Sequence, residues 1–217
     1  FNNVYVFSYS LYNVYIKYAK KRKIIHCLPF IFDDYKISKK KKQINKQKEI
    51  LILHSGSISE YNLPKRNLDK LGKLVEHNNY IKIIFTTTQE HIPSFFKVYL
   101  KRFSNSFLLK KGLSDDELNK IIYKCHFGLD LRDEKNINSN IDFPSKLLIY
   151  IENNLTVFST LSKSIPNSIK EKLINFENIE DYISDIKGKV INPNYDDVNI
   201  FLKSKSLNCI LKNSISN

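Results

Sequence analysis

The sequence predicts an α/β protein with a Rossmann-like, doubly wound parallel sheet, and three observations support this prediction. Short apolar runs rich in β-formers, such as "EILILHSGS" (49–57), alternate with longer amphipathic segments. Parallel neighbours in a sheet need long crossover connections, which those segments supply. The chain has 217 residues, 42% of them hydrophobic, which is enough to bury a sizeable core.

The expected elements follow in order from residue 49. A continuous apolar run is typical of a strand buried on both faces, and such runs occupy 49–57, 80–88, 106–111, 127–132 and 156–160, with a short sixth strand within 170–176. Amphipathic periodicity predicts helices at 63–78, 92–103, 112–125, 142–154, 178–188 and 196–213. Ser114 and Glu117 form a capping box at the start of one of them.

The first 48 residues do not fit this unit. Two expected strands, 4–8 and 23–30, bracket a helix at 11–22, and the polar stretch 33–48 reads as a linker. We therefore expect three parts: a remnant of a preceding domain with its linker (1–48), the Rossmann-like domain (49–192) and a closing C-terminal helix (193–217). The chain begins at Phe1 and contains no Met, which indicates a processed or truncated piece.

Charge favours anionic partners. The chain carries 35 Lys and Arg against 22 Asp and Glu, a net charge of +13, which suits phosphates, acidic membranes or nucleic acid. Only "KKRK" (20–23) and "KKKK" (39–42) form runs, and such runs are typical of solvated linkers. The motifs of nucleic-acid-binding domains are absent, so we expect no specific nucleic-acid partner.

Three scattered cysteines, Cys27, Cys125 and Cys209, exclude a disulfide framework and a zinc site. We expect no metal and a reducing, cytoplasmic setting. No apolar run approaches the roughly 18 to 20 residues of a membrane span, so any membrane contact would be peripheral.

The residues that follow the strands suggest an anion site. Ligands bind beyond the carboxyl ends of strands in such sheets. Gly56 lets the backbone approach a phosphate, the start of the 142–154 helix offers free N–H groups, and Lys146 and Arg66 could add positive charge. A glycine after a strand and an arginine on a helix are equally ordinary structural features, so both interpretations stay open at this point.

Four segments in order resemble a known family. "SGSISEYNLPKRNL", "LLKKGLSDDELNKIIYKCHFGLDLRDE", "DFPSKLLIYI" and "TVFST" are similar to the donor-binding, C-terminal half of GT-B glycosyltransferases, nearest the retaining type that builds bacterial surface polysaccharides. The resemblance covers roughly residues 50 to 190. It implies one GT-B C-terminal domain, which binds a nucleotide sugar, plus a remnant of the N-terminal domain.

The resemblance also implies roles for individual residues. The donor diphosphate would meet Gly56, Ser57, Ser145 and a cation, Arg66 or Lys146. The sugar and nucleotide would be bordered by Thr87, Lys111, Gly112, Leu113, Asp142, Phe143 and Pro144. No metal or other cofactor would be needed, because cationic side chains stabilise the leaving diphosphate. Catalytic residues are not assigned, since the acceptor site belongs largely to the other half.

The implied activity is transfer of a sugar from a nucleotide-diphosphate sugar to a glycan or lipid-linked acceptor. The setting would be cytoplasmic, and the basic surface would suit docking at the anionic inner membrane face. The alternative is a degenerate, non-catalytic binding or assembly protein.

Departures from the family pattern motivate that alternative. Ile149 stands where the family has the Glu that binds the ribose hydroxyls, and the partner of that Glu, eight positions upstream, would be Ile141. Asp142 is adjacent and could substitute for it. Ile149 could instead complete an apolar core stripe with Leu147, Leu148 and Ile151.

Other polar residues have structural explanations. Tyr150 is expected to pack in the core, and the histidines are expected to be structural, with His54 beside the glycine loop as the exception to test. Arg132 and Asp133, at a strand end, either pair with each other or contact substrate.

Overall fold

The computed structural model describes residues 3–6, 15–18, 23–26, 42–43, 49–133, 135–136, 143–186, 189–191 and 193–204. Its centre is a six-stranded sheet in which every neighbouring pair is parallel. The strands are β4 (Ile50–Ser55), β5 (Ile81–Thr87), β6 (Phe107–Lys111), β7 (Phe127–Asp130), β8 (Thr156–Ser159) and β9 (Ile174–Asn175). All six strands predicted from residue 49 onward are thus confirmed.

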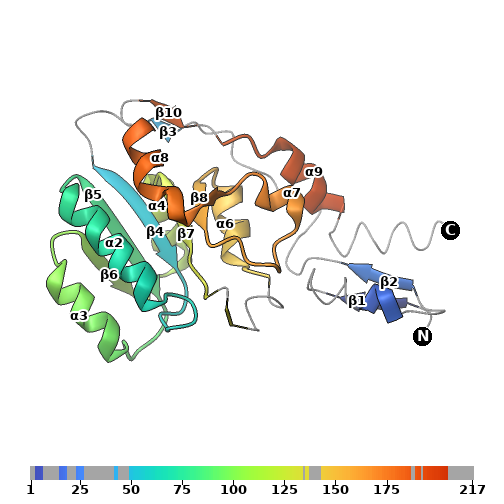
Figure 1. The fold of residues 1–217 in the computed structure, drawn as a ribbon, viewed down its shortest axis with the longest axis horizontal. Coiled ribbons are helices and arrows are strands. Elements are labelled where there is room, and N and C mark those ends of the chain that lie inside the picture. The colour runs from blue at the N-terminus through green and yellow to red at the C-terminus, as the bar shows by residue number, and fades with distance from the viewer. Residues whose placement is uncertain are drawn as a thin grey trace.

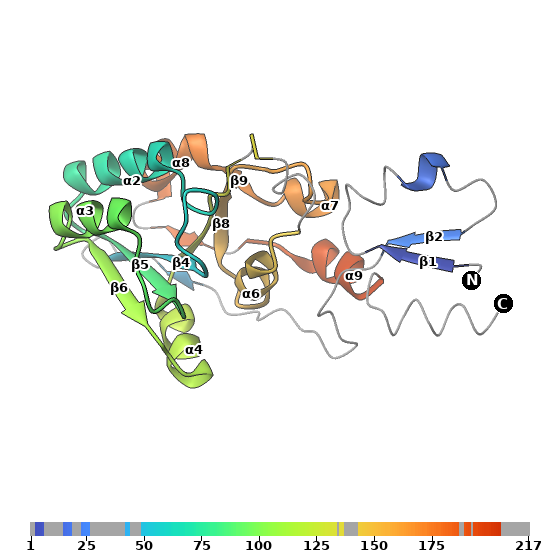
Figure 2. The ribbon, with the colours of Figure 1, turned by 90° about the horizontal axis from the view of Figure 1, so that it is seen from below.

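The strand order is β6-β5-β4-β7-β8-β9 (Figure 1, with β9 labelled in Figure 2). The chain starts in the middle at β4, moves outward to β6, and then returns to β7 on the other side of β4. This is the doubly wound Rossmann order, and the direction of winding reverses between β4 and β7. The predicted fold class is therefore confirmed, and the switch point lies between these two strands.

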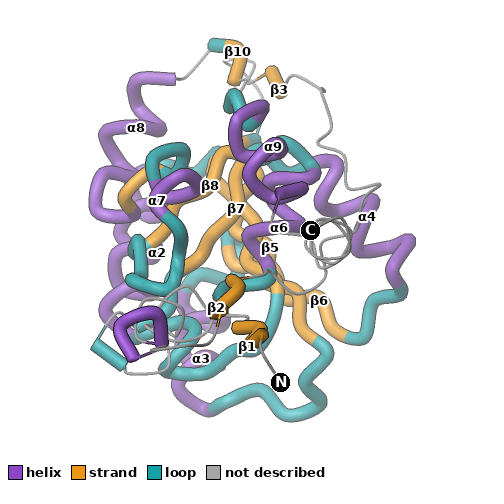
Figure 3. The backbone as a smooth tube through the Cα atoms, turned by 90° about the vertical axis from the view of Figure 1, so that its right-hand side faces the viewer, coloured by secondary structure: helices purple, strands orange, loops and turns teal. Residues whose placement is uncertain are grey.

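Helices cover both faces of the sheet (Figures 2 and 3). One face carries α2 (Lys65–His77), α3 (Ser94–Arg102) and α8 (Ile179–Ile186); the other carries α4 (Asp115–Lys124), α6 (Lys146–Glu152) and α9 (Asp196–Ser204), with the short α7 (Asn167–Lys170) against α9. The 3-10 turn η1 (Phe176–Asn178) leads into α8.

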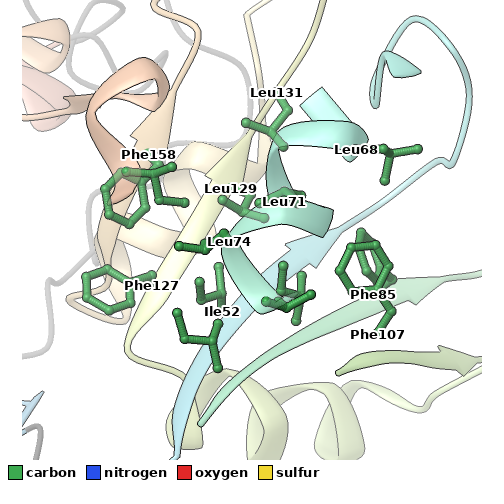
Figure 4. Packing of buried hydrophobic residues seen from close by; sticks show 14 of the residues in the cluster. Ile52, Leu68, Leu71, Leu74, Phe85, Phe107, Phe127, Leu129, Leu131 and Phe158 are labelled. Atoms are coloured by element: carbon green, nitrogen blue, oxygen red, sulfur yellow. The ribbon is translucent and has the colours of Figure 1, made fainter. Parts of the chain in front are cut away.

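Each face of the sheet has its own apolar core. Alternate residues of a strand point to opposite faces, so Ile52 packs beneath α2 while Leu53 joins the α6 side. Figure 4 shows Leu68, Leu71 and Leu74 of α2 over the strands. Burial on both faces explains why the strands appear as continuous apolar runs rather than alternating patterns.

Two elements differ from the predictions. The helix expected over 142–154 is α6, only seven residues long, and it begins at Lys146; proline disfavours helical conformation in the residue before it, which keeps Phe143 outside. The segment expected to be a linker contains β3 (Lys42–Gln43), which pairs antiparallel with β10 (Val190–Ile191). The described part of the last helix, α9, ends at Ser204, and the rest of its predicted range, 205–213, lies outside the described residues.

The amino-terminal segment forms a small separate sheet. Here β1 (Asn3–Val6) and β2 (Lys23–His26) pair in parallel. Strand β2 lies within the predicted range 23–30, and β1 overlaps the predicted range 4–8 but begins one residue earlier. Among the described residues, no helix is long and apolar enough to cross a membrane.

Candidate functional site

A pocket of about 270 Å³ opens at the switch point of the sheet. Strands β4 and β7 pair only at Ile52–Phe127 and Leu53–Gly128, whereas β4 pairs with β5 along its whole length. The carboxyl ends of β4 and β7 therefore leave space between them. We call this space the switch-point pocket; it is lined by Ser55, Gly56, Ser57, Tyr61, Asn62, Arg132, Phe143, Pro144, Ser145 and Lys146.

A second, smaller pocket of about 100 Å³ lies on the β5 side of the same loop. It shares Ser55 and Gly56 with the first and is otherwise lined by Thr86, Thr87, Thr88, Leu113 and Leu118. We call it the threonine pocket. Its lining offers hydroxyl groups and apolar surface, without a charged side chain.

Gly56 separates the two pockets. Its φ is +117°, a conformation that side chains with a Cβ rarely adopt. A Cβ placed there would meet nothing within 4 Å, so the backbone conformation, rather than crowding, requires glycine. The Gly56 N–H donates to the carbonyl of Thr86 at 2.9 Å, which fixes the start of the loop against β5.

A buried charge cluster forms one wall of the switch-point pocket. Asp130, at the end of β7, is fully buried. Its Oδ1 lies 3.5 Å from Nε of Arg132 and 3.7 Å from Nζ of Lys146, and Ser159 Oγ donates to Oδ2 at 3.0 Å. Burial lowers the pKa of Lys146, while Asp130 acts in the opposite direction. Asp130 thus lies between two basic side chains that both line the pocket, Arg132 and Lys146.

The loop after β8 holds Arg132 in place. The Nη2 of Arg132 donates to Ser162 Oγ at 3.0 Å and to Ser164 Oγ at 3.2 Å. Thr160 Oγ1 donates to the Arg132 carbonyl at 2.9 Å. Within this loop Leu161 adopts a positive φ of 55°, which is strained for a residue with a Cβ. The loop therefore orients an arginine whose side chain also lines the pocket.

The structure brings most of the predicted site residues together. Six of them line the switch-point pocket: Gly56, Ser57, Phe143, Pro144, Ser145 and Lys146. Thr87 and Leu113 line the threonine pocket. Lys111 and Gly112 lie beside it without lining it: the Lys111 ammonium donates to the Glu90 carbonyl, and Gly112, with a φ of +58°, donates its N–H to Thr87.

Two predicted residues are placed otherwise. Arg66 lies on the exposed side of α2 and lines neither pocket, because the buried face of that helix is made by Asn67, Leu68 and their helical neighbours. Asp142, like Ile141, lies outside the described residues. No cap hydrogen bond is formed by the side chain of Ser145, which occupies the position before α6.

Sequence reasoning missed Asp130. Arg132 and Asp133 were expected to pair with each other or to contact substrate; the structure shows Arg132 facing Asp130 and lining the pocket, and contact with substrate stays a prediction. A signal was present in "FGLDLR" (127–132), where a carboxylate and a guanidinium interrupt an apolar run. Charged groups are rarely buried unless they are paired or bind a ligand.

Ile149 and His54 also depart from expectation. Ile149 is 36% exposed while its neighbours Leu148 and Tyr150 are buried, so the interpretation that it completes a core stripe is wrong; it lines neither pocket. His54 is fully buried beneath the loop, and among the described residues neither ring nitrogen has a hydrogen-bond partner. Burial and the nearby charge of Lys146 hold the pKa of His54 well below its usual 6.5.

Sequence comparisons identify no relative: no protein-family model and no curated protein matches the chain. Solved structures do match. The glycosyltransferase AviGT4, involved in avilamycin A biosynthesis, superposes with a TM-score of 0.60 at 10% identity over 100% of this chain and 65% of its own. The pneumococcal O-GlcNAc transferase GtfA, in complex with UDP and GlcNAc, gives 0.59 at 12% identity over 86% of this chain and 39% of its own.

A third match is to an isolated domain. The C-terminal domain of the group 1 glycosyl transferase LpcC from Francisella tularensis gives a TM-score of 0.50 at 10% identity, over 70% of this chain and 84% of that domain. The chain has the fold of a GT-B C-terminal domain. This confirms the predicted resemblance at the level of the fold. Sequence identities of 10 to 12% show a shared fold and nothing about activity. Within this GT-B fold, the switch-point pocket lies at the carboxyl ends of the central strands. The chain spans 39% of the length of GtfA.

Proposed function

We propose that this chain supplies the donor-binding half of a glycosyltransferase, which transfers a sugar from a nucleotide-diphosphate sugar. The observation that carries the proposal is the switch-point pocket, which is lined by the Gly56 loop, the buried Arg132 and the partly buried Lys146. GtfA, which shares this fold, was solved in complex with UDP and GlcNAc. This supports a nucleotide sugar as the class of ligand.

The proposed chemistry rests on charge. When the bond between sugar and diphosphate breaks, negative charge develops on the leaving diphosphate. Arg132 and Lys146 are held in place before the reaction, so they stabilise that charge without reorganising. In this proposal the side chains themselves neutralise the diphosphate, and no metal is required. Ser57, Ser145 and the Gly56 backbone add hydrogen-bond donors, and the threonine pocket takes part of the nucleoside.

The rest of the enzyme would come from another domain. We propose a glycan or lipid-linked acceptor bound to an N-terminal half, with the retaining stereochemistry and surface-polysaccharide role that the resemblance implies. The net charge of +13 would favour docking at an anionic membrane surface on the cytoplasmic side. Demonstrating transfer requires that other half.

The donor proposal is tested by calorimetry with UDP, GDP and their sugars. Wild type is expected to bind one of these nucleotides. Arg132→Gln should weaken that binding about tenfold or more, because a hydrogen bond to a charged group contributes about 1.5 to 3 kcal/mol. Arg66→Gln is the matched control, since Arg66 lines neither pocket, and it should leave the affinity unchanged. Absence of binding by wild type at millimolar nucleotide would sink the proposal.

Ile149 supports the alternative of a non-catalytic binding or assembly protein. An exposed isoleucine stands where the resemblance implies a ribose-binding Glu. Ile149→Glu should leave nucleotide binding unchanged if the site has lost that role. A gain of about tenfold or more would instead indicate an impaired but genuine donor site, because one restored charged hydrogen bond is worth at least that much.

A further inference from the structure

We infer that Tyr150 is a positioning residue: its hydroxyl is inserted between the ends of β4 and β7, where it holds the two strands apart and orients the Gly56 loop. The expected effect of Tyr150 on nucleotide affinity rests on the proposed function. The contact between Tyr150 and Ser55 does not depend on that function and can be tested without a ligand.

The register of the two strands shows what the hydroxyl replaces. Strand β4 pairs with β7 at Ile52–Phe127 and Leu53–Gly128, and the pairing then stops. Continued by two residues, it would place Ser55 opposite Asp130 and direct the Ser55 N–H at the carbonyl of Leu129. Instead the Ser55 N–H donates to the Tyr150 hydroxyl at 2.8 Å, and that hydroxyl lies 3.5 Å from the Leu129 carbonyl, to which it donates.

The ring of Tyr150 packs directly against Gly128 of β7. The side chain is fully buried, and a Cβ added to Gly128 would lie 2.6 Å from the ring. Glycine at 128 therefore makes room for the ring against β7. Burial raises the pKa of Tyr150, so the phenol stays protonated and can both accept and donate a hydrogen bond.

The position of this hydroxyl matters for the site. Ser55 and Gly56 line both pockets, and Gly56 is held to β5 through Thr86. Tyr150 supplies the corresponding anchor on the β7 side. Without its hydroxyl, the partly buried Ser55 N–H would lack its partner, and the strand end would either close on β7 or fray.

Tyr150→Phe removes only the oxygen. Hydrogen exchange of the Ser55 amide, followed by NMR, should become about tenfold faster or more, while exchange of the Ile52 amide in the strand interior should be unchanged relative to global stability. The affinity for UDP or GDP, whichever wild type binds, should fall by about fivefold or more, because the loop must be ordered on binding.

Tyr195→Phe is the matched control. Tyr195 is equally buried, and its hydroxyl donates to the Leu155 carbonyl at 2.8 Å, but it lines neither pocket. Tyr195→Phe should reduce the free energy of unfolding by about as much as Tyr150→Phe does. It should leave the hydrogen exchange of the Ser55 amide and the nucleotide affinity unchanged. Unchanged Ser55 exchange in Tyr150→Phe, or equal affinity losses in both variants, would overturn the inference.

Two provisions keep the outcomes distinct. If wild type binds no nucleotide, the proposed function fails, and the exchange measurement alone decides the role of Tyr150. If Tyr150→Phe does not fold, Gly128→Ala moves the ring while keeping its hydroxyl, and faster Ser55 exchange is again expected. Ser55 exchange at the wild-type rate in a folded Gly128→Ala protein would count against the inference.

Discussion

At the scale of single residues, Asp130 organises the charged wall of the site. It is fully buried and lies within 3.7 Å of both Arg132 and Lys146. Removing one member of a buried ion pair is strongly destabilising, because the other member is left as an uncompensated charge in a medium of low polarity. The three members should therefore respond very differently to substitution.

Asp130→Asn should destabilise the protein by about 3 to 5 kcal/mol, because it removes the buried carboxylate that lies beside Arg132 and Lys146. Lys146→Met should change stability by no more than about 1 kcal/mol, because Arg132 still balances Asp130 and only a partly buried basic group has gone. Urea denaturation at neutral pH measures both. Equal losses in the two variants would contradict this account of the cluster.

His54 predicts a pH dependence of stability. Its pKa is well below 6.5 in the folded protein and about 6.5 when unfolded, so the unfolded chain binds the extra proton. Stability is therefore fully present above about pH 6.5 and decreases as pH falls from there towards the folded pKa.

The matching measurement is the free energy of unfolding at about pH 7.5 and about pH 5.5. His54→Leu should remove most of the decrease, because leucine keeps the burial and has no proton to bind. His77→Gln, at an exposed position of α2, is the control and should retain it. A pH profile that His54→Leu leaves unaltered would assign the effect to other groups.

At the scale of elements, α4 shows how a local sequence signal becomes structure. Ser114 Oγ accepts from the Glu117 N–H at 3.4 Å, and the Glu117 carboxylate accepts from the Ser114 N–H at 2.9 Å. Both halves of the predicted capping box are present. The contacts are local, so the motif could be identified without knowledge of the fold.

Ser114→Ala should destabilise the protein by about 1 kcal/mol at neutral pH. Hydrogen bonds from the Ser114 backbone and side chain lower the pKa of Glu117, so this stabilisation is present above the ordinary carboxylate pKa and is lost as pH falls through the lowered one. The difference between wild type and variant should therefore shrink on acidification. A difference that grows at low pH would be inconsistent with the capping box.

Gly72 of α2 packs against Phe103, the residue that follows α3. Helix propensity and steric crowding have opposite effects on stability at this position. Alanine usually stabilises a helix interior by about 0.5 to 1 kcal/mol relative to glycine. At Gly72, however, an added Cβ would lie 2.5 Å from the ring of Phe103, and overpacking costs about 1 to 3 kcal/mol. Gly72→Ala should therefore be destabilising overall.

Thermal unfolding of Gly72→Ala, with Lys73→Ala as the control, tests this balance. Lys73 is exposed, so its replacement should change stability by less than about 0.5 kcal/mol. A higher melting temperature for Gly72→Ala would show that Phe103 moves aside easily and that helix propensity dominates at this position.

At the scale of the whole molecule, the net charge of +13 opposes compaction, because like charges repel more strongly in the folded chain. Raising sodium chloride from about 0.01 M to about 0.1 M shortens the Debye length from about 30 Å to about 10 Å. The melting temperature should therefore rise over this range. Arg132→Gln should show the same rise, which separates general screening from anion binding in the pocket. A melting temperature that falls with salt would contradict the repulsion argument.

The fold could be predicted largely from the sequence. Strand and helix periods, glycine turns and the capping box depend on neighbouring residues, so they determine the order of elements and with it the doubly wound class. The position of the pocket at the strand ends follows from that topology, which is why the predicted residues Gly56, Ser57 and 143–146 line it.

Only the tertiary structure decided which charges meet there. Arg132 lines the pocket and Arg66 does not, Asp130 lies beside Arg132 and Lys146, and Ile149 is exposed, because these outcomes depend on which face of an element is buried. The contact of Ser55 with Tyr150 joins residues 95 positions apart. Sequence periodicity determines local conformation, but contacts over such separations are set by packing and strand register, and the chemistry of this pocket depends on those contacts.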